Sequence, residues 1–170
     1  MLEIYNSSRK AKEIIARLSD LSRKNTSLTF QYVSPDELVR KVLAVASPAR
    51  PPHVEVRTDL ACRHLWLRGN EIQLSQMLLN LILNAYHAME PGGGTLTVAT
   101  RPEGEFLCFQ VSDTGSGISP EVLPHIFEPF FTTKERGKGT GLRLAIVRQV
   151  MEEHKGTIAI DTAPGRGTTM

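Results

Sequence analysis

The sequence lacks any apolar run long enough to cross a membrane, and it has no large excess of charge of either sign. A membrane-spanning helix needs about 20 mostly apolar residues, which no stretch of the chain provides. The N-terminal segment MLEIYNSSRKAKEII carries charges throughout and lacks the apolar centre of a signal peptide. A net charge of +2, with basic residues spread along the chain, gives no reason to expect nucleic acid or an anionic membrane as a partner. The sequence therefore predicts a cytoplasmic protein without a membrane segment.

Cysteine is scarce as well. Cys62 and Cys108 have neither the spacing of metal ligands nor that of a redox pair. Both fall in strand-like stretches, where a buried and inert thiol is the commoner case. With 41% hydrophobic and 22% charged residues, the chain can bury a globular core. Its 170 residues correspond to one ordinary domain and at most an appendage.

The N-terminal 25 residues have the pattern of a helical arm. Apolar residues recur at steps of three and four from Ile4 to Leu21 and form a narrow seam with charged flanks. One such helix cannot bury its seam alone. The spacing is equally compatible with a helix that pairs with a second chain and with one that caps the core of its own domain.

The remainder of the chain alternates between strand and helix patterns. A helix starts at Ser34 with a capping residue, a proline and early acids, and longer helices are predicted at 70–89 and 142–154. The residues 95–101 and 105–113 predict an antiparallel hairpin. Further strands are predicted at 28–33, 54–59, 64–69 and 156–163, with a turn between the second and third of these. Strands clustered between three helices favour a two-layer α/β sandwich over a doubly wound parallel sheet.

Two asparagine side chains, Asn80 and Asn84, lie four residues apart and hence on one face of the helix at 70–89. Most of that helix is core material, so buried amides would need partners. A capping role is one explanation, but a ligand or a hydrated cation fits better. A carboxamide oxygen is a suitable ligand for Mg²⁺ that keeps several water ligands and is otherwise coordinated by phosphate oxygens. His87, three residues after Asn84, could reach a phosphate, although by itself it would be an ordinary solvated residue.

A carboxylate, Asp113, ends the strand 105–113 and meets the sequence Thr-Gly-Ser-Gly. At a strand end it can accept a hydrogen bond from an exocyclic amine such as that of adenine. Gly115 and Gly117 would let the backbone approach a flat base without a Cβ clash. Taken alone, Asp-Thr-Gly is also ordinary turn chemistry.

A long segment without regular structure, 119–141, separates this turn from the helix at 142–154. Phenylalanines at 127, 130 and 131 could anchor it, and Lys134, Arg136 and Lys138 place positive charge above any phosphates. The glycines at 137, 139 and 141 supply flexibility. The following helix presents free N–H groups and the positive end of its dipole. A flexible basic loop with no ligand is the alternative explanation.

Four patches in this order and at these spacings resemble the catalytic ATP-binding domain of sensor histidine kinases. That domain belongs to a wider superfamily with gyrase, heat-shock chaperone and mismatch-repair ATPases. The segment 80–89 is similar to the asparagine box, 113–134 to the first glycine box running into the phenylalanine box, 137–147 to the second glycine box, and 165–169 to the turn before the last strand. The similarity covers about residues 28–170. The segments 89–101 and 127–134 particularly resemble kinases of the nitrogen-regulation type.

This resemblance implies a fold, two cofactors and a set of site residues. The fold would be a Bergerat-type α/β sandwich with a mixed sheet and three main helices over 28–170. The residues 1–27 would correspond to the second helix of a dimerisation and histidine-phosphotransfer domain. The cofactors would be ATP and Mg²⁺, with the metal on Asn84 and catalytic roles for Asn80 and Lys134. The nucleotide would meet Asn80, Asn84, His87, Asp113, Gly115, Gly117, Ile118, Lys134, Gly137, Gly139, Thr140, Gly141, Leu142 and Thr168.

Asn80 is the residue that separates the subfamilies by chemistry. The ATPases of this superfamily carry a water-activating glutamate at this position, and anti-sigma-factor kinases usually carry an acid. An asparagine cannot act as a general base, so the resemblance implies a site that positions ATP for phosphoryl transfer to a histidine rather than for hydrolysis.

Three departures from the family pattern complicate a simple kinase assignment. None of the five histidines, at 53, 64, 87, 125 and 154, lies where the phospho-accepting residue would be. Arg143 stands where the family usually has glycine, and it could either touch phosphate or crowd the lid. The chain also stops at Met170, where we expect the last strand to begin, so the sequence resembles a fragment or an engineered core with a short sheet edge.

The expected function is therefore a kinase module that takes its substrate histidine from another polypeptide or segment. Its expected partners are the phosphotransfer and dimerisation domain and a downstream response regulator, with a homodimer possible through the N-terminal helix. It could be the cytoplasmic part of a larger sensor. The alternatives are a nucleotide-binding regulator that has lost phosphotransfer and, third, a slow ATPase.

Overall fold

The computed structural model describes residues 29–90, 92–133 and 140–170. In this part of the chain no helix combines the length and apolarity needed to cross a membrane. The N-terminal helical arm predicted at 1–27, and hence the domain boundary after it, lie outside the described residues.

The helices are α2 (Pro35–Ala46), α3 (Glu71–Met89) and α4 (Arg143–Glu153), with short 3₁₀ helices η1 (Ser47–Ala49) and η2 (Leu123–His125). The strands are β1 (Gln31–Val33), β2 (Val54–Leu60), β3 (Leu67–Gly69), β4 (Gly94–Glu103), β5 (Phe106–Asp113), β6 (Asp161–Ala163) and β7 (Gly167–Thr169).

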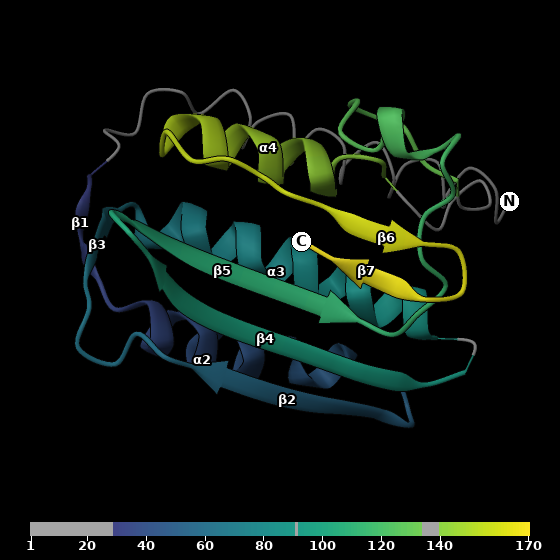
Figure 1. Cartoon of the computed structure of the whole chain (residues 1–170), viewed down its shortest axis with the longest axis horizontal. Coiled ribbons are helices and arrows are strands. Elements are labelled where there is room, and N and C mark those ends of the chain that lie inside the picture. Colours follow the sequence, from purple (N-terminus) through teal and green to yellow (C-terminus); the bar gives the residue numbers. More distant parts are fainter. Residues whose placement is uncertain (1–28, 91, 134–139) are drawn as a thin grey trace, which may run out of the picture.

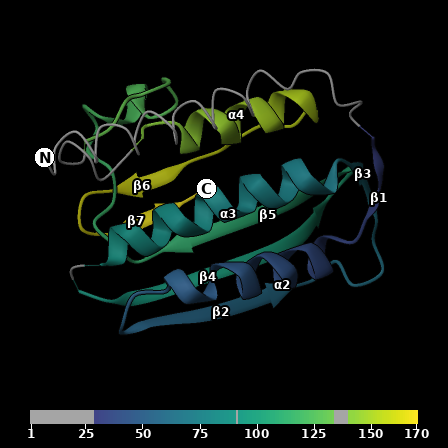
Figure 2. The same ribbon diagram turned by 180° about the vertical axis from the view of Figure 1, so that it is seen from behind.

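A five-stranded mixed sheet carries three helices on one of its faces, which confirms the predicted two-layer α/β sandwich (Figures 1 and 2). Its strand order is β2-β4-β5-β7-β6. The β2–β4 pair is parallel, and the remaining pairs are antiparallel. The hairpin predicted for β4 and β5 is present, with Leu96 opposite Asp113.

The core lies between the helical layer and the inner face of the sheet, and α3 contributes most to it. Its apolar side chains recur every three or four residues, so one side of the helix is continuously buried. Burial of a large apolar side chain stabilises the fold by roughly 1.5–3 kcal/mol. The fully buried residues of the two layers include Leu38, Val39, Leu78, Ile82, Met89, Leu96, Val98 and Val147.

The start and the end of α3 follow the sequence signals. The Asn70 side chain caps the helix by accepting a hydrogen bond from the Gln73 N–H at 3.1 Å. At the other end Gly93, with φ of +72°, donates its N–H to the Met89 carbonyl at 2.8 Å. A glycine in the left-handed region therefore ends the helix.

The strands predicted at 54–59 and 64–69 lie in different sheets. The second is only three residues long, and it pairs with β1 as a separate two-stranded sheet in which Tyr32 faces Arg68. β2 instead pairs with β4. Apolar alternation shows that a segment is extended but does not specify its partner, because the partner is chosen by contacts distant in the sequence.

The C-terminal strands correct two expectations. The strand predicted at 156–163 is limited to its last three residues, because its neighbour β7 offers partners only for Asp161–Ala163. The segment 165–169, expected to be a turn before a missing last strand, contains β7 itself. This strand lies inside the sheet between β5 and β6, and Met170 continues the pairing with Val111 through two backbone hydrogen bonds. The expected short sheet edge is therefore wrong, since β2 and β6 form the edges.

Two glycines of the β6–β7 connection provide a matched pair for a stability measurement. Gly165 and Gly167 both have positive φ, +73° and +88°. A Cβ on Gly165 would meet nothing within 4 Å, whereas one on Gly167 would lie 1.9 Å from the Asp113 carbonyl oxygen. We expect Gly165→Ala to cost about 1–2 kcal/mol of backbone strain. Gly167→Ala should cost at least about 3 kcal/mol, because the clash also forces β7 from β5. Urea unfolding of both variants measures the difference, and equal losses would contradict the described contact.

Candidate functional site

A cavity of about 650 Å³ opens between the C-terminal half of α3, the start of α4 and the ends of β5 and β7. Leu81, Val111, Ile126 and Met170 give it an apolar wall. Polar groups enter from Asn84, Asp113 and Thr168. A mostly apolar hollow with a few convergent polar groups is the usual form of a site for a small organic ligand.

Asn84 and His87 lie on the α3 side of this cavity. The Asn84 amide oxygen is 3.5 Å from Nη1 of Arg143, a long contact. The His87 Nδ1 is 3.3 Å from a carboxylate oxygen of Glu90, one turn further along. Asn80 belongs to the same helix but does not line the cavity. Its side-chain nitrogen is buried and has no hydrogen-bond partner among the described residues.

A buried N–H group without a partner costs free energy, so the Asn80 amide is suited to an acceptor that arrives with a ligand. A phosphate oxygen or a metal-bound water would serve. In the described part of the chain no three His, Cys, Asp or Glu side chains come together as a metal cluster. A neutral amide such as Asn84 therefore fits Mg²⁺ that takes most of its oxygen ligands from phosphate and water.

Asp113 occupies the last position of β5, directly opposite Thr168 on β7. One carboxylate oxygen accepts the Gly115 N–H at 2.8 Å. The Thr168 hydroxyl lies 3.0 Å from that of Thr162. Burial raises the pKa of the Asp113 carboxyl above its ordinary value, while the backbone N–H groups of Gly115 and Thr168 act in the opposite sense. Backbone N–H groups thus orient the Asp113 carboxylate, and the same residue lines the cavity.

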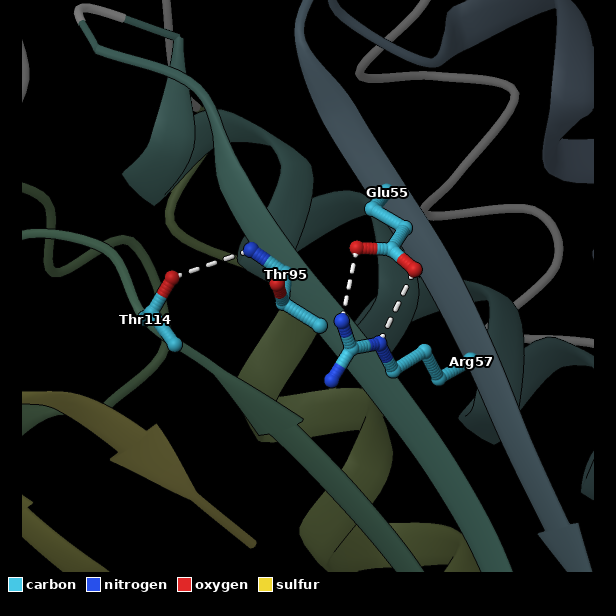
Figure 3. Close-up of polar contacts among 4 residues, drawn as sticks. All are labelled: Glu55, Arg57, Thr95 and Thr114. Carbon is cyan, nitrogen blue, oxygen red and sulfur yellow. Dashed lines mark hydrogen bonds and ion pairs between the residues drawn. The ribbon is translucent and has the colours of Figure 1, made fainter.

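The turn after Asp113 is held on the first residues of β4. Thr114 accepts the Thr95 N–H on its hydroxyl at 3.0 Å, as Figure 3 shows, and donates its own N–H to the Thr95 carbonyl at 3.2 Å. The Glu55–Arg57 pair in the same view is exposed, so it contributes little to stability. The Thr95–Thr114 contacts fix where β5 ends and therefore where Asp113 lies.

The glycines of this turn are required by close packing. A Cβ on Gly115 would lie 2.6 Å from the Ala88 carbonyl oxygen of α3, and one on Gly117, whose φ is +68°, would lie 2.0 Å from the Ala163 carbonyl oxygen. Gly117 lines the cavity but Gly115 does not. Both glycines let the turn fit between α3 and β6, and the predicted approach of a flat base at either of them stays a prediction.

The ends of the segment between η2 and α4 meet beside the cavity. The Phe130 N–H donates to the Gly141 carbonyl at 3.0 Å. Gly141 has φ of +65°, and a Cβ there would lie 2.3 Å from the Phe130 backbone. Thr140 and Gly141 line the cavity. The predicted Lys134, Gly137 and Gly139 lie outside the described residues.

The start of α4 carries one buried and one cavity-lining side chain. Leu142, at the capping position, is 2% exposed and belongs to the core, so it does not line the cavity. Arg143 follows it and enters the cavity. The positive end of the α4 dipole and the arginine therefore lie on the same side as Asn84.

Of the fourteen residues expected to meet the nucleotide, the structure brings eight together around one cavity. These are Asn84, His87, Asp113, Gly117, Ile118, Thr140, Gly141 and Thr168. Asn80, Gly115 and Leu142 are not among its lining residues, and the other three are not described. Sequence reasoning missed much of the lining, including Ser116, Ser119, Val122, Thr132 and Met170. The apolar ones among these carry no signal of their own, because a core residue and a pocket residue have the same pattern.

The raised pKa of Asp113 has a consequence for stability. An acid whose pKa is higher in the folded than in the unfolded chain opposes folding when it is ionised. The penalty is complete above the folded pKa and disappears below the ordinary value of 3.8. We therefore expect Asp113→Asn to be more stable than the unmodified chain at pH 7, and the two to converge as the pH falls below about 4. Thermal melting against pH tests this, with Asp161→Asn, which removes an exposed carboxylate, as the control. A less stable Asp113→Asn at pH 7 would contradict it.

Comparison with known proteins gives consistent matches. Residues 69–170 match the family described as histidine kinase-, DNA gyrase B-, and HSP90-like ATPase. The chain is 34% identical over 185 aligned positions to the sensor kinase CckA of Brucella abortus, covering 99% of this chain and 19% of that kinase. The chain thus spans about a fifth of this relative.

Two solved structures share the fold. The mycobacterial sensor histidine kinase MprB is 27% identical with a TM-score of 0.72, and the match covers 83% of this chain and 93% of that one. Full-length ShkA, in complex with AMPPNP, is 30% identical with a TM-score of 0.71, and the match covers 84% of this chain and 30% of ShkA.

Proposed function

Since the chain belongs to the family of histidine kinase-, DNA gyrase B- and HSP90-like ATPases, we propose that it is the ATP-binding catalytic module of a sensor histidine kinase. The observation that carries this proposal is the cavity in which Asn84, Asp113 and Thr168 face one another from three separate elements. The AMPPNP bound to ShkA supports an adenine nucleotide as the ligand.

Each end of the cavity suits one end of ATP. The adenine would lie against Asp113, whose carboxylate accepts the exocyclic amine, with Thr168 beside it and Gly117 and Ile118 against the ring. The phosphates would extend toward Asn84, His87 and the start of α4. There the free N–H groups and the dipole of the helix favour negative charge.

Mg²⁺ is proposed to bind through the Asn84 amide oxygen together with phosphate oxygens and water. When bound, it would neutralise charge on the phosphates and hold them in line with the acceptor. Asn80 is proposed to donate its buried amide N–H to a phosphate oxygen or to a metal-bound water. Lys134, with the glycines at 137 and 139, is proposed to cover the phosphates.

The reaction would be transfer of the γ-phosphoryl group to a histidine. The bond from the γ-phosphorus to its bridging oxygen breaks, a bond to an imidazole nitrogen forms, and ADP leaves. Asn80 has no basic group with which to activate water, and this favours transfer over hydrolysis. The acceptor histidine would come from a phosphotransfer and dimerisation domain, and a response regulator would receive the group next.

The experiment that tests the proposal supplies the missing acceptor. The chain is incubated with γ-labelled ATP, Mg²⁺ and a separately produced histidine-phosphotransfer domain. The expected result is label on that domain and none on the chain alone. A His→Gln acceptor domain is the control. Phosphate release without labelling would contradict the kinase proposal and favour an ATPase.

A second function, a nucleotide-binding regulator without phosphotransfer, is favoured by one observation. The amide oxygen proposed for the metal is already in contact with Arg143. ATP binding without labelling of any acceptor domain, in the same experiment, would select the regulator. A cytoplasmic location and a homodimer formed through residues 1–27 complete the proposal, and sedimentation of the chain with and without those residues tests the second.

A further inference from the structure

Arg143 is the feature of the cavity that the proposed function leaves unexplained. Among the described residues that line the cavity, it is the only one with a permanent positive charge. Its role therefore has to be found in its position and contacts.

The backbone before Arg143 directs its side chain into the cavity. Leu142 is anchored in the core at 2% exposure, and Gly141 is fixed by its positive φ and its packing on the Phe130 backbone. Arg143 is the first residue of α4. With both preceding residues fixed, the guanidinium reaches Asn84, whose amide oxygen lies 3.5 Å from Nη1.

The contact involves the same oxygen that we propose as the metal ligand. A guanidinium donates hydrogen bonds but does not lose its charge, and a neutral amide is a modest acceptor for it. A phosphate is a much better one, because charge-assisted hydrogen bonds are roughly twice as strong and a planar guanidinium can form two in parallel. Bound ATP would therefore draw Arg143 from Asn84 toward its phosphates.

We infer that Arg143 is a built-in cation that binds the nucleotide phosphates directly and so supplies part of the charge neutralisation otherwise left to Mg²⁺. This inference rests on the proposed function. It specifies that ATP binding by this chain depends only weakly on a divalent metal. It also assigns the Arg143–Asn84 contact to the nucleotide-free state.

The test measures ATP dissociation constants by calorimetry, once with excess Mg²⁺ and once with EDTA. Arg143→Gln removes the charge and keeps a polar side chain of similar length. We expect it to weaken ATP binding in EDTA at least tenfold and ATP binding with Mg²⁺ much less. The ratio of the dissociation constant in EDTA to that with Mg²⁺ should therefore rise. Arg143→Lys should give an intermediate ratio, because lysine keeps the positive charge but lacks the planar guanidinium that can form two parallel hydrogen bonds. Arg148→Gln, on an exposed face of the same helix, should leave the ratio unchanged.

Each other outcome would overturn the inference. An unchanged ratio in Arg143→Gln means that the arginine does not replace metal charge, and equal tightening in both buffers means that it only crowds the cavity. Either result leaves the proposed function standing, since ATP still binds. Failure of the unmodified chain to bind ATP in either buffer would instead reject both proposals. Far-ultraviolet circular dichroism and a thermal melting curve verify that each variant is folded.

Discussion

Replacing Asp113 by asparagine is expected to weaken ATP binding by about 100-fold. The substitution keeps the shape of the side chain and its bond with the Gly115 N–H, but it removes the charge from the acceptor proposed for the adenine amine. A hydrogen bond to a charged group contributes about 1.5–3 kcal/mol, and the upper part of this range applies because burial has already removed water from the carboxylate. Calorimetric titration with ATP measures the loss.

The matched control is Asp161→Asn, which removes one carboxylate at an exposed position of β6 and should bind ATP normally. GTP, whose base carries a carbonyl where adenine has its amine, should bind poorly to the unmodified chain. In Asp113→Asn the affinity for GTP should rise relative to that for ATP. Unchanged ATP affinity in that variant would reject the adenine assignment. Because we also expect the variant to be more stable at pH 7, a loss of binding could not be attributed to unfolding.

Replacing Asn84 by alanine is expected to have the largest effect on activity, a loss of about 1,000-fold in phosphotransfer to a separate histidine domain. Removal of one positioned electrostatic group typically costs a factor of about 100–1,000, and Asn84 is the proposed protein ligand of the metal. The affinity for ATP in EDTA should change little, since Asn84 is proposed to hold the phosphates through the metal. Labelling of the acceptor domain over time gives the rate.

The matched control is Gln76→Ala, which removes an exposed amide from the same helix. It should transfer phosphate at the unmodified rate. Normal labelling by Asn84→Ala would show that the metal is held elsewhere. A parallel loss of rate and of metal-free ATP affinity would indicate a collapsed cavity instead, which a melting curve would detect.

The layers of the fold and its hairpin could be predicted from the sequence, and the partners of strands distant in the sequence could not. The helix α3 was predicted within one residue, because the pattern of a helix lies within its own segment. The hairpin of β4 and β5 was predicted for the same reason. The pairing of β3 with β1, the parallel pairing of β2 with β4, and the interior position of β7 depend on contacts between distant segments, which alternation of residue types does not encode.

For the site, sequence patterns predicted the polar groups better than the walls. Asn84, Asp113 and Thr168 come from three separate segments, and they line one cavity as the resemblance implied. Gly115 packs against Ala88 and Leu142 lies in the core, and the contact of either residue with the nucleotide stays a prediction. A motif gives residue types at fixed spacing, and the direction of each side chain is decided only when the segments pack together.

The distance between Asn84 and Arg143 also depends on a joint at the opposite ends of their two helices. His154, just after α4, accepts the Asn70 N–H on Nε2 at 3.0 Å and binds the Val150 carbonyl through Nδ1 at 2.8 Å. This imidazole thereby ties the end of α4 to the beginning of α3. From His154 to Arg143 the helix measures about 16 Å at 1.5 Å per residue. A change of ~5° in the crossing angle at the joint would displace the arginine by ~1.5 Å over that length. The geometry of the proposed phosphate end is therefore set in part by a histidine that does not line the cavity.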